Sequence, residues 1–331
     1  MPVAKLENIS TEIIIGKYCK KPLKLSMPIM ITGMSYGGSL SLRMGIALAK
    51  GASMAGTSTN TGESTITKEV RKNARYVVGQ YNRALLMKEE DLKFLDAIEV
   101  QMGQGAWGGA VESITYAKDI DERLRKDWRI KKGEDRLFRA RMEGVNSEKD
   151  FIALISKLKR EHDVPIGIKI AATDFIEYEL DVITSTKCDY IVIDGCEGGT
   201  AVAPPTLEDN LGLPTLHALI RTANYLKKNK LQHKFDLIMA GGLTTPGHFL
   251  KALALGANAV YIGSIAIMAA VHNQAIKLLP QLPPTELALN TGSHKEDLNI
   301  DLAARSLNNF LISCQKEMIM ALQAMGKKKI T

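Results

Sequence analysis

Two pairs of small residues in the C-terminal third of the chain have the type and spacing to bind a phosphate group. Gly241-Gly242 and Gly263-Ser264 each follow a short apolar segment, and about twenty residues separate the two pairs. Glycine lets backbone N–H groups approach an anion closely, and the N-terminus of a following helix adds a favourable dipole. The pattern predicts a phosphate site at these pairs; the alternative is that the glycines only form turns.

Lys169 is a charged residue inside an otherwise apolar segment, Ile166 to Ala171. An unpaired buried ammonium group is costly, so the lysine is expected to face a negative partner. One interpretation is an ion pair with a carboxylate such as Asp194 or Glu99. The other is that Lys169 faces a bound cofactor on which negative charge develops during a reaction.

Polar and small residues also follow other apolar segments of the chain. They are Ser35-Tyr36-Gly37-Gly38, Asn60-Thr61-Gly62-Glu63, Gln101, Gln104, Gly105, Trp107 and the run from Asp194 to Thr200. Any one of these groups alone is typical of a turn. Their repetition at the ends of successive apolar segments indicates one shared site.

The elements that must position these residues are short apolar segments that alternate with amphipathic ones. Eight strands are predicted: Pro28–Thr32, Met54–Thr57, Tyr76–Val78, Ala97–Met102, Ile166–Ile170, Tyr190–Asp194, Leu237–Ala240 and Ala259–Ile262. Near-continuous apolar strands between helices are typical of a parallel sheet buried on both faces. Eight of them close a barrel, so we predict an α/β fold, a (β/α)8 TIM barrel with its site at the C-terminal mouth.

The segments between and after the strands predict helices, one insertion and a tail. Ser147 is an expected N-cap for a helix that buries Phe151 and Leu158, and a second helix is expected to begin at Pro214. A highly charged insertion at 103–146, between the fourth and fifth strands, is expected over the mouth. We predict one domain over 1–331, with a barrel core at about 27–275 and a C-terminal helix at about 297–326 docked on the outside.

Composition excludes several classes of function. The net charge is +7, but lysines and arginines are scattered among acids and aromatic residues make up only 5%, so nucleic-acid binding is not expected. The four cysteines lie far apart without a C-x-x-C motif, which indicates a reduced cytoplasmic chain without a metal site. No apolar segment approaches the roughly 18 residues of a membrane span.

The ordered motifs resemble the FMN-binding synthase domain of glutamate synthase. They are Ser35-Tyr36-Gly37, Ser58 to Glu63, Gln101 to Ala106, Lys169, Asp194 to Ala201 and Ala240 to Leu243. The resemblance runs from about residue 27 to 275. The tail is similar to that of short, stand-alone glutamate-synthase-like flavoproteins.

The resemblance implies FMN as cofactor and assigns roles to residues of this chain. The implied cofactor-binding residues are Met34, Ser35, Tyr36, Asn60, Gln101, Lys169, Gly199, Thr200, Gly241, Gly242, Gly263 and Ser264. Lys169 is expected at the pyrimidine edge of the flavin, while Glu63 and Gln104 orient the substrate over the flavin N5. Trp107 and Cys196 are expected to complete the substrate site, with Cys196 either a reactive thiol or a small polar filler.

The chain also departs from the family pattern at positions that matter for the substrate. Gln101 and Trp107 stand where the family has two lysines that help to hold 2-oxoglutarate and its imine. Trp107 therefore predicts a less anionic or larger substrate, and glutamate formation is not expected. No cysteine lies between residues 197 and 313, so the iron–sulfur cysteines of the family are missing, and no amidotransferase domain is expected.

These observations predict an FMN-dependent oxidoreductase acting on an imine-like, keto-acid-like or other unsaturated small molecule, as an enzyme of CH–NH2 or C=N groups. Two alternatives stay open. One is a flavin-dependent isomerase or transferase without net redox change, and the other is an FMN electron-transfer subunit of a larger complex. We expect an electron-donor protein as a partner, a homo-oligomer, and neither nucleic acid nor a membrane.

Overall fold

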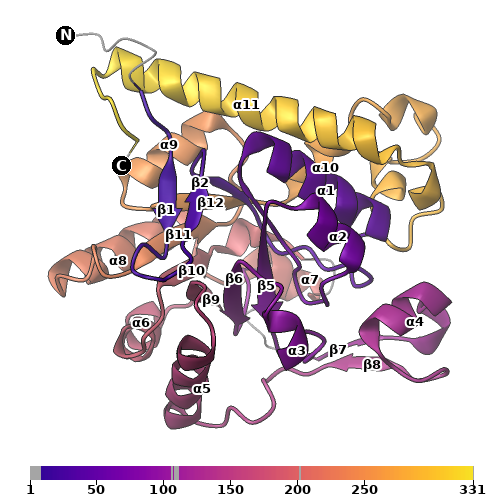
Figure 1. The fold of residues 1–331 in the computed structure, drawn as a ribbon, viewed down its shortest axis with the longest axis horizontal. Helices are drawn as coiled ribbons and strands as arrows, with labels where there is room; N and C mark the ends of the chain where they lie inside the picture. The colour runs from indigo at the N-terminus through magenta and orange to yellow at the C-terminus, as the bar shows by residue number, and fades with distance from the viewer. Residues whose placement is uncertain (1–8, 106, 108–111, 201–202, 331) are drawn as a thin grey trace.

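The computed structural model describes residues 9–105, 107, 112–200 and 203–330, and its centre is one parallel sheet of eight strands (Figure 1). In chain order the strands are β3 Ile29–Ile31, β4 Ser58–Asn60, β5 Tyr76–Tyr81, β6 Ala97–Gln101, β9 Ile166–Ala171, β10 Tyr190–Asp194, β11 Asp236–Ala240 and β12 Ala259–Ile262. Hydrogen-bonded neighbours follow the order β3-β12-β11-β10-β9-β6-β5-β4, and the end strands β3 and β4 contact each other. The sheet is thus a nearly closed barrel, which confirms the predicted TIM-barrel fold.

One of the eight predicted strands is wrong. Met54 and Ala55 form the last turn of helix α1, and Gly56 ends that helix with φ of +74°. A glycine in the left-handed region is a common helix C-cap, and this one was the signal missed in the sequence. The second barrel strand therefore begins later, at Ser58.

Helices cover the outside of the barrel between successive strands. Their bounds are α1 Leu42–Ala55, α2 Lys68–Asn73, α3 Glu89–Leu92, α5 Glu148–Glu161, α6 Ile176–Ser185, α7 Pro205–Asn210, α8 Thr215–Lys228, α9 Pro246–Ala254 and α10 Ser264–Val271, with 3-10 turns η3 Cys196–Gly198, η4 Ala275–Lys277, η5 Pro284–Leu287 and η6 Lys295–Asp297. The Ser147 side chain accepts from the N–H of Asp150 and caps α5, as predicted. The other predicted start is confirmed within one residue, because Pro214 is the N-cap of α8.

A short hairpin covers the N-terminal end of the barrel. It consists of β1 (Ile13–Ile15) and β2 (Leu23–Leu25), which pair antiparallel. Their buried side chains pack with Tyr190 and Ala259, which stand at the starts of barrel strands. The C-terminal end of the barrel, where the strands end, is therefore the end that can hold a site.

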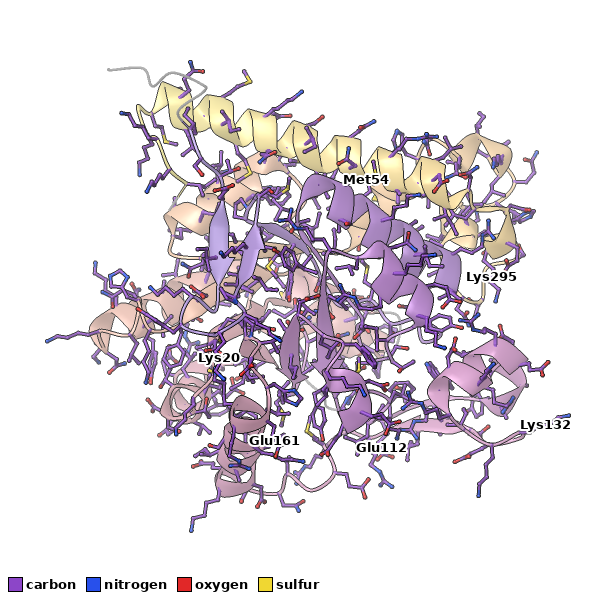
Figure 2. The ribbon with its side chains drawn as sticks, viewed as in Figure 1. Lys20, Met54, Glu112, Lys132, Glu161 and Lys295 are labelled. Atoms are coloured by element: carbon purple, nitrogen blue, oxygen red, sulfur yellow. The ribbon has the colours of Figure 1, made fainter. Side chains whose placement is uncertain are left out.

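The charged insertion between β6 and β9 forms a small subdomain beside the mouth, on the side of α2 and α3 (Figure 1). It holds the hairpin β7 (Ser113–Thr115) and β8 (Arg136–Phe138), the turn η2 (Ala117–Asp119) and helix α4 (Glu122–Trp128). Figure 2 shows Lys132 pointing away from the molecule at its outer end.

Apolar residues of the insertion pack on the segments that follow β3 and β5. Leu124 and Trp128 form a cluster with Tyr36, Ala84 and Leu86. These partners lie just beyond the ends of barrel strands, so the insertion lies at the mouth, as the sequence predicted.

The C-terminal tail is one long helix, α11 (Ile300–Ala324), which runs along the outside of the barrel over α1, α9 and α10 (Figure 1). Gly51 of α1 makes this packing close, because a Cβ there would stand 2.9 Å from the carbonyl oxygen of Ala304. The predicted C-terminal helix is confirmed. None of the helices in the described ranges combines the length and apolar character that crossing a membrane requires.

Candidate functional site

The ends of β11 and β12 form a cradle of backbone groups. The two strands are parallel neighbours with Ile238 opposite Ala259, and continuing this register places Gly242 level with Gly263. Neighbouring strands lie about 4.8 Å apart, so both glycines line one short arc of the mouth. Helix α10 begins at Ser264, and its glycine cap supplies no side-chain bond to the first N–H groups. This arc therefore presents the glycine backbone and a helix N-terminus that no cap side chain bonds.

The backbone of the cradle adopts conformations that favour glycine. Gly241 has φ of +114° and Gly242 has φ of +61°. A Cβ at Gly241 would also collide with the Thr215 hydroxyl. That hydroxyl lies 2.9 Å from the carbonyl oxygen of Gly241 and 2.7 Å from Glu197 Oε2, which also accepts from the Thr215 N–H at 2.8 Å. A carboxylate from the loop after β10 thus braces the first glycine turn.

Lys169 lies buried on β9, two strands from β11 in the barrel, and pairs with a carboxylate. Its Nζ is 3.0 Å from Asp194 Oδ2, and the two side chains are 2% and 6% exposed. Burial alone would lower the pKa of Lys169, but the carboxylates of Asp194 and Glu99 outweigh burial and raise it. The structure shows the ion pair that the sequence analysis left as one interpretation, while contact with a flavin stays a prediction.

Gln101 ends β6 beside Lys169, its partner in the strand register. Its Nε2 is 3.5 Å from Gln104 Oε1, whereas its Oε1 is buried and has no partner among the described residues. The turn that follows packs closely on the loop after β10, because a Cβ at Gly105 would collide with the carbonyl group of Gly195. The structure thus brings both predicted glutamines together at the mouth.

Below the mouth, Glu99 is a fully buried carboxylate with several donors around it. Gln80 Nε2 and the Tyr261 hydroxyl each donate to it at 2.8 Å, and Asn60 Nδ2 is 3.3 Å away. The amide of Asn60 is thus directed into the barrel, while its Oδ1 accepts from the N–H of Gly62. The predicted cofactor role of Asn60 remains untested, and its observed contacts are internal.

Arg83, which the sequence analysis did not single out, is the most unusual residue of the mouth. It follows β5 and is 3% exposed. Its Nε donates to Glu63 Oε1 at 3.1 Å, and its guanidinium carbon lies 3.4 Å from the centroid of the Trp107 ring. Burial lowers the pKa of Arg83, and Glu63 opposes that shift. Glu63 and Trp107, both predicted substrate residues, therefore contact an arginine that no sequence motif indicated.

Met34 and Ser35 lie at the mouth between two strand ends, and their contact with FMN stays a prediction. A Cβ at Gly62 would stand 2.6 Å from the Ser35 N and 2.8 Å from the Met34 N. The Met34 sulfur is also 3.9 Å from the ideal Cβ position of Gly263. The segment therefore connects the β4 end with the glycine cradle.

Tyr36 differs from the two residues before it. Its ring packs against the insertion and its hydroxyl donates to Asp127 at 3.3 Å. Burial and the Asp127 carboxylate raise the pKa of this hydroxyl. Tyr36 therefore anchors the insertion in this structure.

Cys196 lies in the loop after β10, next to Glu197. Burial and the Glu197 carboxylate raise the pKa of its thiol, so the thiolate is disfavoured at neutral pH. These surroundings favour the small polar filler over the reactive thiol.

The end of the same loop is only partly described. Gly199 has φ of +53°, and no heavy atom of the described residues lies within 4 Å of the position of a Cβ. Thr200 follows it, partly buried. Ala201 and Ala106, which belong to the motifs of the resemblance, lie outside the described residues.

Comparison with known proteins identifies the sequence relatives of the chain. Residues 3–328 match the family described as the conserved region in glutamate synthase. A glutamate synthase large subunit-like protein of Rhizobium meliloti is 33% identical over 271 residues, covering 81% of this chain and 61% of that protein. An archaeal-type glutamate synthase [NADPH] of Thermotoga neapolitana is 35% identical over 250 residues, covering 75% of this chain and 49% of that protein. The chain thus spans about half to three fifths of the length of these relatives.

Solved structures with the same fold are more distant in sequence. Mandelate oxidase with (S)-4-hydroxymandelic acid aligns with a TM-score of 0.59 at 15% identity, over all of this chain and 84% of that one. A flavocytochrome b2 mutant with benzoylformate aligns with a TM-score of 0.58 at 15% identity, over 98% of this chain and 71% of that one. At this identity the likeness supports the barrel fold alone.

Proposed function

The chain belongs to the glutamate synthase family, and from that premise we propose that it is an FMN-dependent oxidoreductase. Its proposed substrate is an imine, a keto acid or a related unsaturated small molecule. The observation that carries the proposal is the glycine cradle at the ends of β11 and β12, which faces a mouth lined by Lys169 and Gln101. The family match supports FMN as the cofactor.

The residues of the cradle fit the phosphate of FMN. Gly242 and the first turn of α10 offer N–H groups that no side chain caps, and the dipole of α10 favours an anion at Ser264. The open space beside Gly199 lies in the loop that Glu197 ties to this cradle through Thr215. A backbone site of this kind needs no positive side chain.

Residues of β6 and β9 fit the polar edge of a flavin ring. Gln101 Oε1 is a buried acceptor without a partner in the described part of the chain, and an N–H of a ring would satisfy it. Lys169 keeps its proton because of Asp194 and Glu99, so its ammonium group can stabilise negative charge on a ligand. When bound, FMN supplies hydride exchange between its N5 and a carbon–nitrogen or carbon–carbon double bond.

Glu63, Gln104 and Trp107 are the proposed substrate side of the mouth. Gln104 is tied to Gln101 and Glu63 is tied to Arg83, so the polar atoms are held in place before a substrate binds. The insertion packs on Tyr36, Ala84 and Leu86 beyond the ends of β3 and β5, and its proposed role is to limit the access of water to the mouth. Orientation of the substrate by held polar groups and exclusion of water are the contributions we assign to this chain.

A flavin oxidoreductase needs a donor that supplies electrons to the flavin. We propose a partner protein, or a dinucleotide that visits the mouth, as that donor. Among relatives, the archaeal-type glutamate synthases carry NADPH in their names.

The test is anaerobic photoreduction of the protein reconstituted with FMN, followed by mixing with 2-oxo acids and ammonium. We expect one FMN per chain and rapid reoxidation of the reduced flavin by at least one 2-oxo acid in the presence of ammonium. A Gly241→Ala variant, whose cradle cannot adopt the observed backbone without strain, should bind FMN weakly. Failure of the wild-type protein to bind FMN would overturn the proposal.

The same experiment separates the two alternative functions. An isomerase or transferase would turn over its substrate with reduced FMN present and leave the flavin reduced. An electron-transfer subunit would bind and exchange electrons with a donor protein but would not be reoxidised by any small substrate. Either result would replace the oxidoreductase proposal while keeping the flavin site.

A further inference from the structure

The guanidinium of Arg83 is buried and only partly satisfied. Glu63 Oε1 accepts from its Nε, whereas Nη1 and Nη2 are both buried without a partner among the described residues. Natural structures rarely leave buried donors unpaired, and hydrogen bonds to charged groups are among the stronger ones. A side chain 3% exposed with two such atoms therefore indicates a ligand that completes it.

The neighbours of Arg83 fix the direction in which its free nitrogens are available. Glu63 occupies the Nε side, and the Trp107 ring covers one face at 3.4 Å from the guanidinium carbon. What remains is the outer edge formed by Nη1 and Nη2. That edge is a planar pair of donors, whose geometry matches the two oxygens of a carboxylate.

Arg83 also lines part of a cavity. Its volume is about 370 Å³, and its lining includes Arg83, Gln101, Arg141, Met142 and Phe151. A second arginine adds positive charge, and Gln101 connects the cavity to the mouth. Ser147 and Glu148, also in the lining, begin α5, so one acid stands at the rim. The cavity is large enough for a small organic acid but not for a macromolecule.

We propose that Arg83 binds the carboxylate of the substrate, and that Glu63 and Trp107 are positioning residues for Arg83. The inference rests on the proposed function, because it places the ligand beside the mouth where the flavin is proposed to bind. It also reverses the expectation drawn from Trp107, since the ring that replaces a lysine lies against a cation. The substrate is therefore an organic anion.

The test is isothermal titration calorimetry of the FMN-loaded protein with pyruvate, 2-oxobutyrate and 2-oxoglutarate. Pyruvamide serves as the neutral counterpart of pyruvate, and inorganic phosphate as an anion of different shape. We expect one site for at least one of the acids, no heat from pyruvamide, and at least about tenfold weaker binding of that acid by Arg83→Gln. Binding of phosphate alone, or of no acid at all, would overturn the proposal.

Matched variants separate charge from geometry. Arg83→Lys keeps the charge without the planar pair of donors and should bind the acid with an affinity between wild type and Arg83→Gln. Trp107→Leu and Glu63→Gln should weaken acid binding less than Arg83→Gln, and raise KM more than they lower kcat. Arg160→Gln, an exposed arginine at the end of α5 far from the mouth, should change nothing. Equal affinity in Arg83→Gln and Arg160→Gln would contradict the proposal.

An FMN titration by flavin fluorescence in the same samples distinguishes the two proposals. If Arg83→Gln binds FMN as wild type does but no longer binds the acid, Arg83 is assigned as the binding site of the carboxylate. If wild type binds FMN but no acid, the proposed role of Arg83 is refuted and the proposed flavin site stands. If wild type binds no FMN, the proposed function fails, and the acid titration on the FMN-free protein still tests Arg83.

Discussion

The two sides of the barrel mouth are built from different parts of the chain. On the β11–β12 side the groups offered to a ligand are backbone N–H groups, held by glycines with positive φ at 241 and 242 and by the start of α10. On the β5–β6 side they are long side chains, and the principal one, Arg83, is buried against Trp107 and Glu63.

This difference separates the two tasks of such a site. A backbone cradle suits a phosphate that is the same in every turnover, because main-chain groups keep their position without help from side chains. A site built from side chains suits the substrate, which differs between related enzymes, because one substitution changes which substrate binds. Gln101 and Trp107, the departures that the resemblance leads us to expect, fall on the side-chain side, whereas Gly241 and Gly242 belong to the motifs that carry the resemblance.

The largest effect is expected from Asp194→Asn, at the end of β10, which lies between the two sides in the strand order. This change leaves the buried ammonium of Lys169 without its nearest carboxylate, and losing one partner of a buried pair costs about 3–5 kcal/mol. We expect that loss in the free energy of unfolding measured with urea. Asp163→Asn is the control, because its pair with Lys20 is exposed and should contribute less than about 1 kcal/mol. Equal losses in the two variants would show that the buried pair is not important for stability.

The challenge to the backbone side is Gly241→Ala. A side chain at φ of +114° strains the backbone and collides with Thr215, at a cost of about 1–3 kcal/mol. We expect FMN affinity to fall by about tenfold to a hundredfold in a fluorescence titration. Gly247→Ala in α9 is the control, since the nearest atom to its Cβ would be 3.8 Å away. Unchanged affinity in Gly241→Ala would mean that the cradle is not the phosphate site.

A smaller effect is expected where the insertion supports the side-chain side. Trp128 Nε1 donates to Ser64 Oγ at 3.0 Å, and Trp128→Phe removes this bond while keeping a ring against Phe138. The loss should be about 1 kcal/mol, seen as faster amide hydrogen exchange in α4 with FMN affinity unchanged. Tyr116→Phe, in an exposed part of the insertion, should leave the exchange rates as they are. A drop in FMN affinity with Trp128→Phe would show that the insertion and the glycine cradle are coupled, whereas we expect them to be independent.

The smallest expected effect concerns pH on the backbone side. Burial opposes ionisation of Glu197, but the hydroxyl and N–H of Thr215 bond its carboxylate and hold its pKa below the ordinary 4.5. A lowered pKa in the fold means that the stabilisation is present above pH 4.5 and is lost as the pH falls through the lowered pKa. FMN affinity should therefore weaken by less than about tenfold on acidification in that range. Glu197→Gln should remove the pH dependence; if the variant retains it, another group is responsible.

The backbone cradle could be predicted from the sequence, as could Glu63, Gln101, Gln104 and Trp107 at the mouth, but Arg83 could not. Glycines at the ends of apolar strands are local signals, so the cradle, the barrel and the lysine inside a strand were all readable from Gly241, Gly263 and Lys169. Arg83 lies in an unremarkable stretch, and its burial depends on Trp107 and Glu63, which come from two other strand ends. Contacts between distant segments leave no pattern in a single sequence.

The strand at 54–57 is wrong, whereas the cofactor role of Tyr36 stays a prediction. Gly56 ends a helix that continues two residues into the expected strand, and only the left-handed conformation of that glycine shows the boundary. Tyr36 follows the family motif, but its ring is directed to an insertion whose packing the motif does not encode.

The most direct test of this account is a crystal structure of the protein grown with FMN and a 2-oxo acid that it binds. We predict the phosphate on the N–H groups of Gly242 and Ser264, the polar edge of the flavin at Lys169 and Gln101, and the carboxylate of the acid on Nη1 and Nη2 of Arg83. A phosphate bound away from the β11–β12 ends, or an acid that leaves the Arg83 nitrogens unpaired, would contradict it.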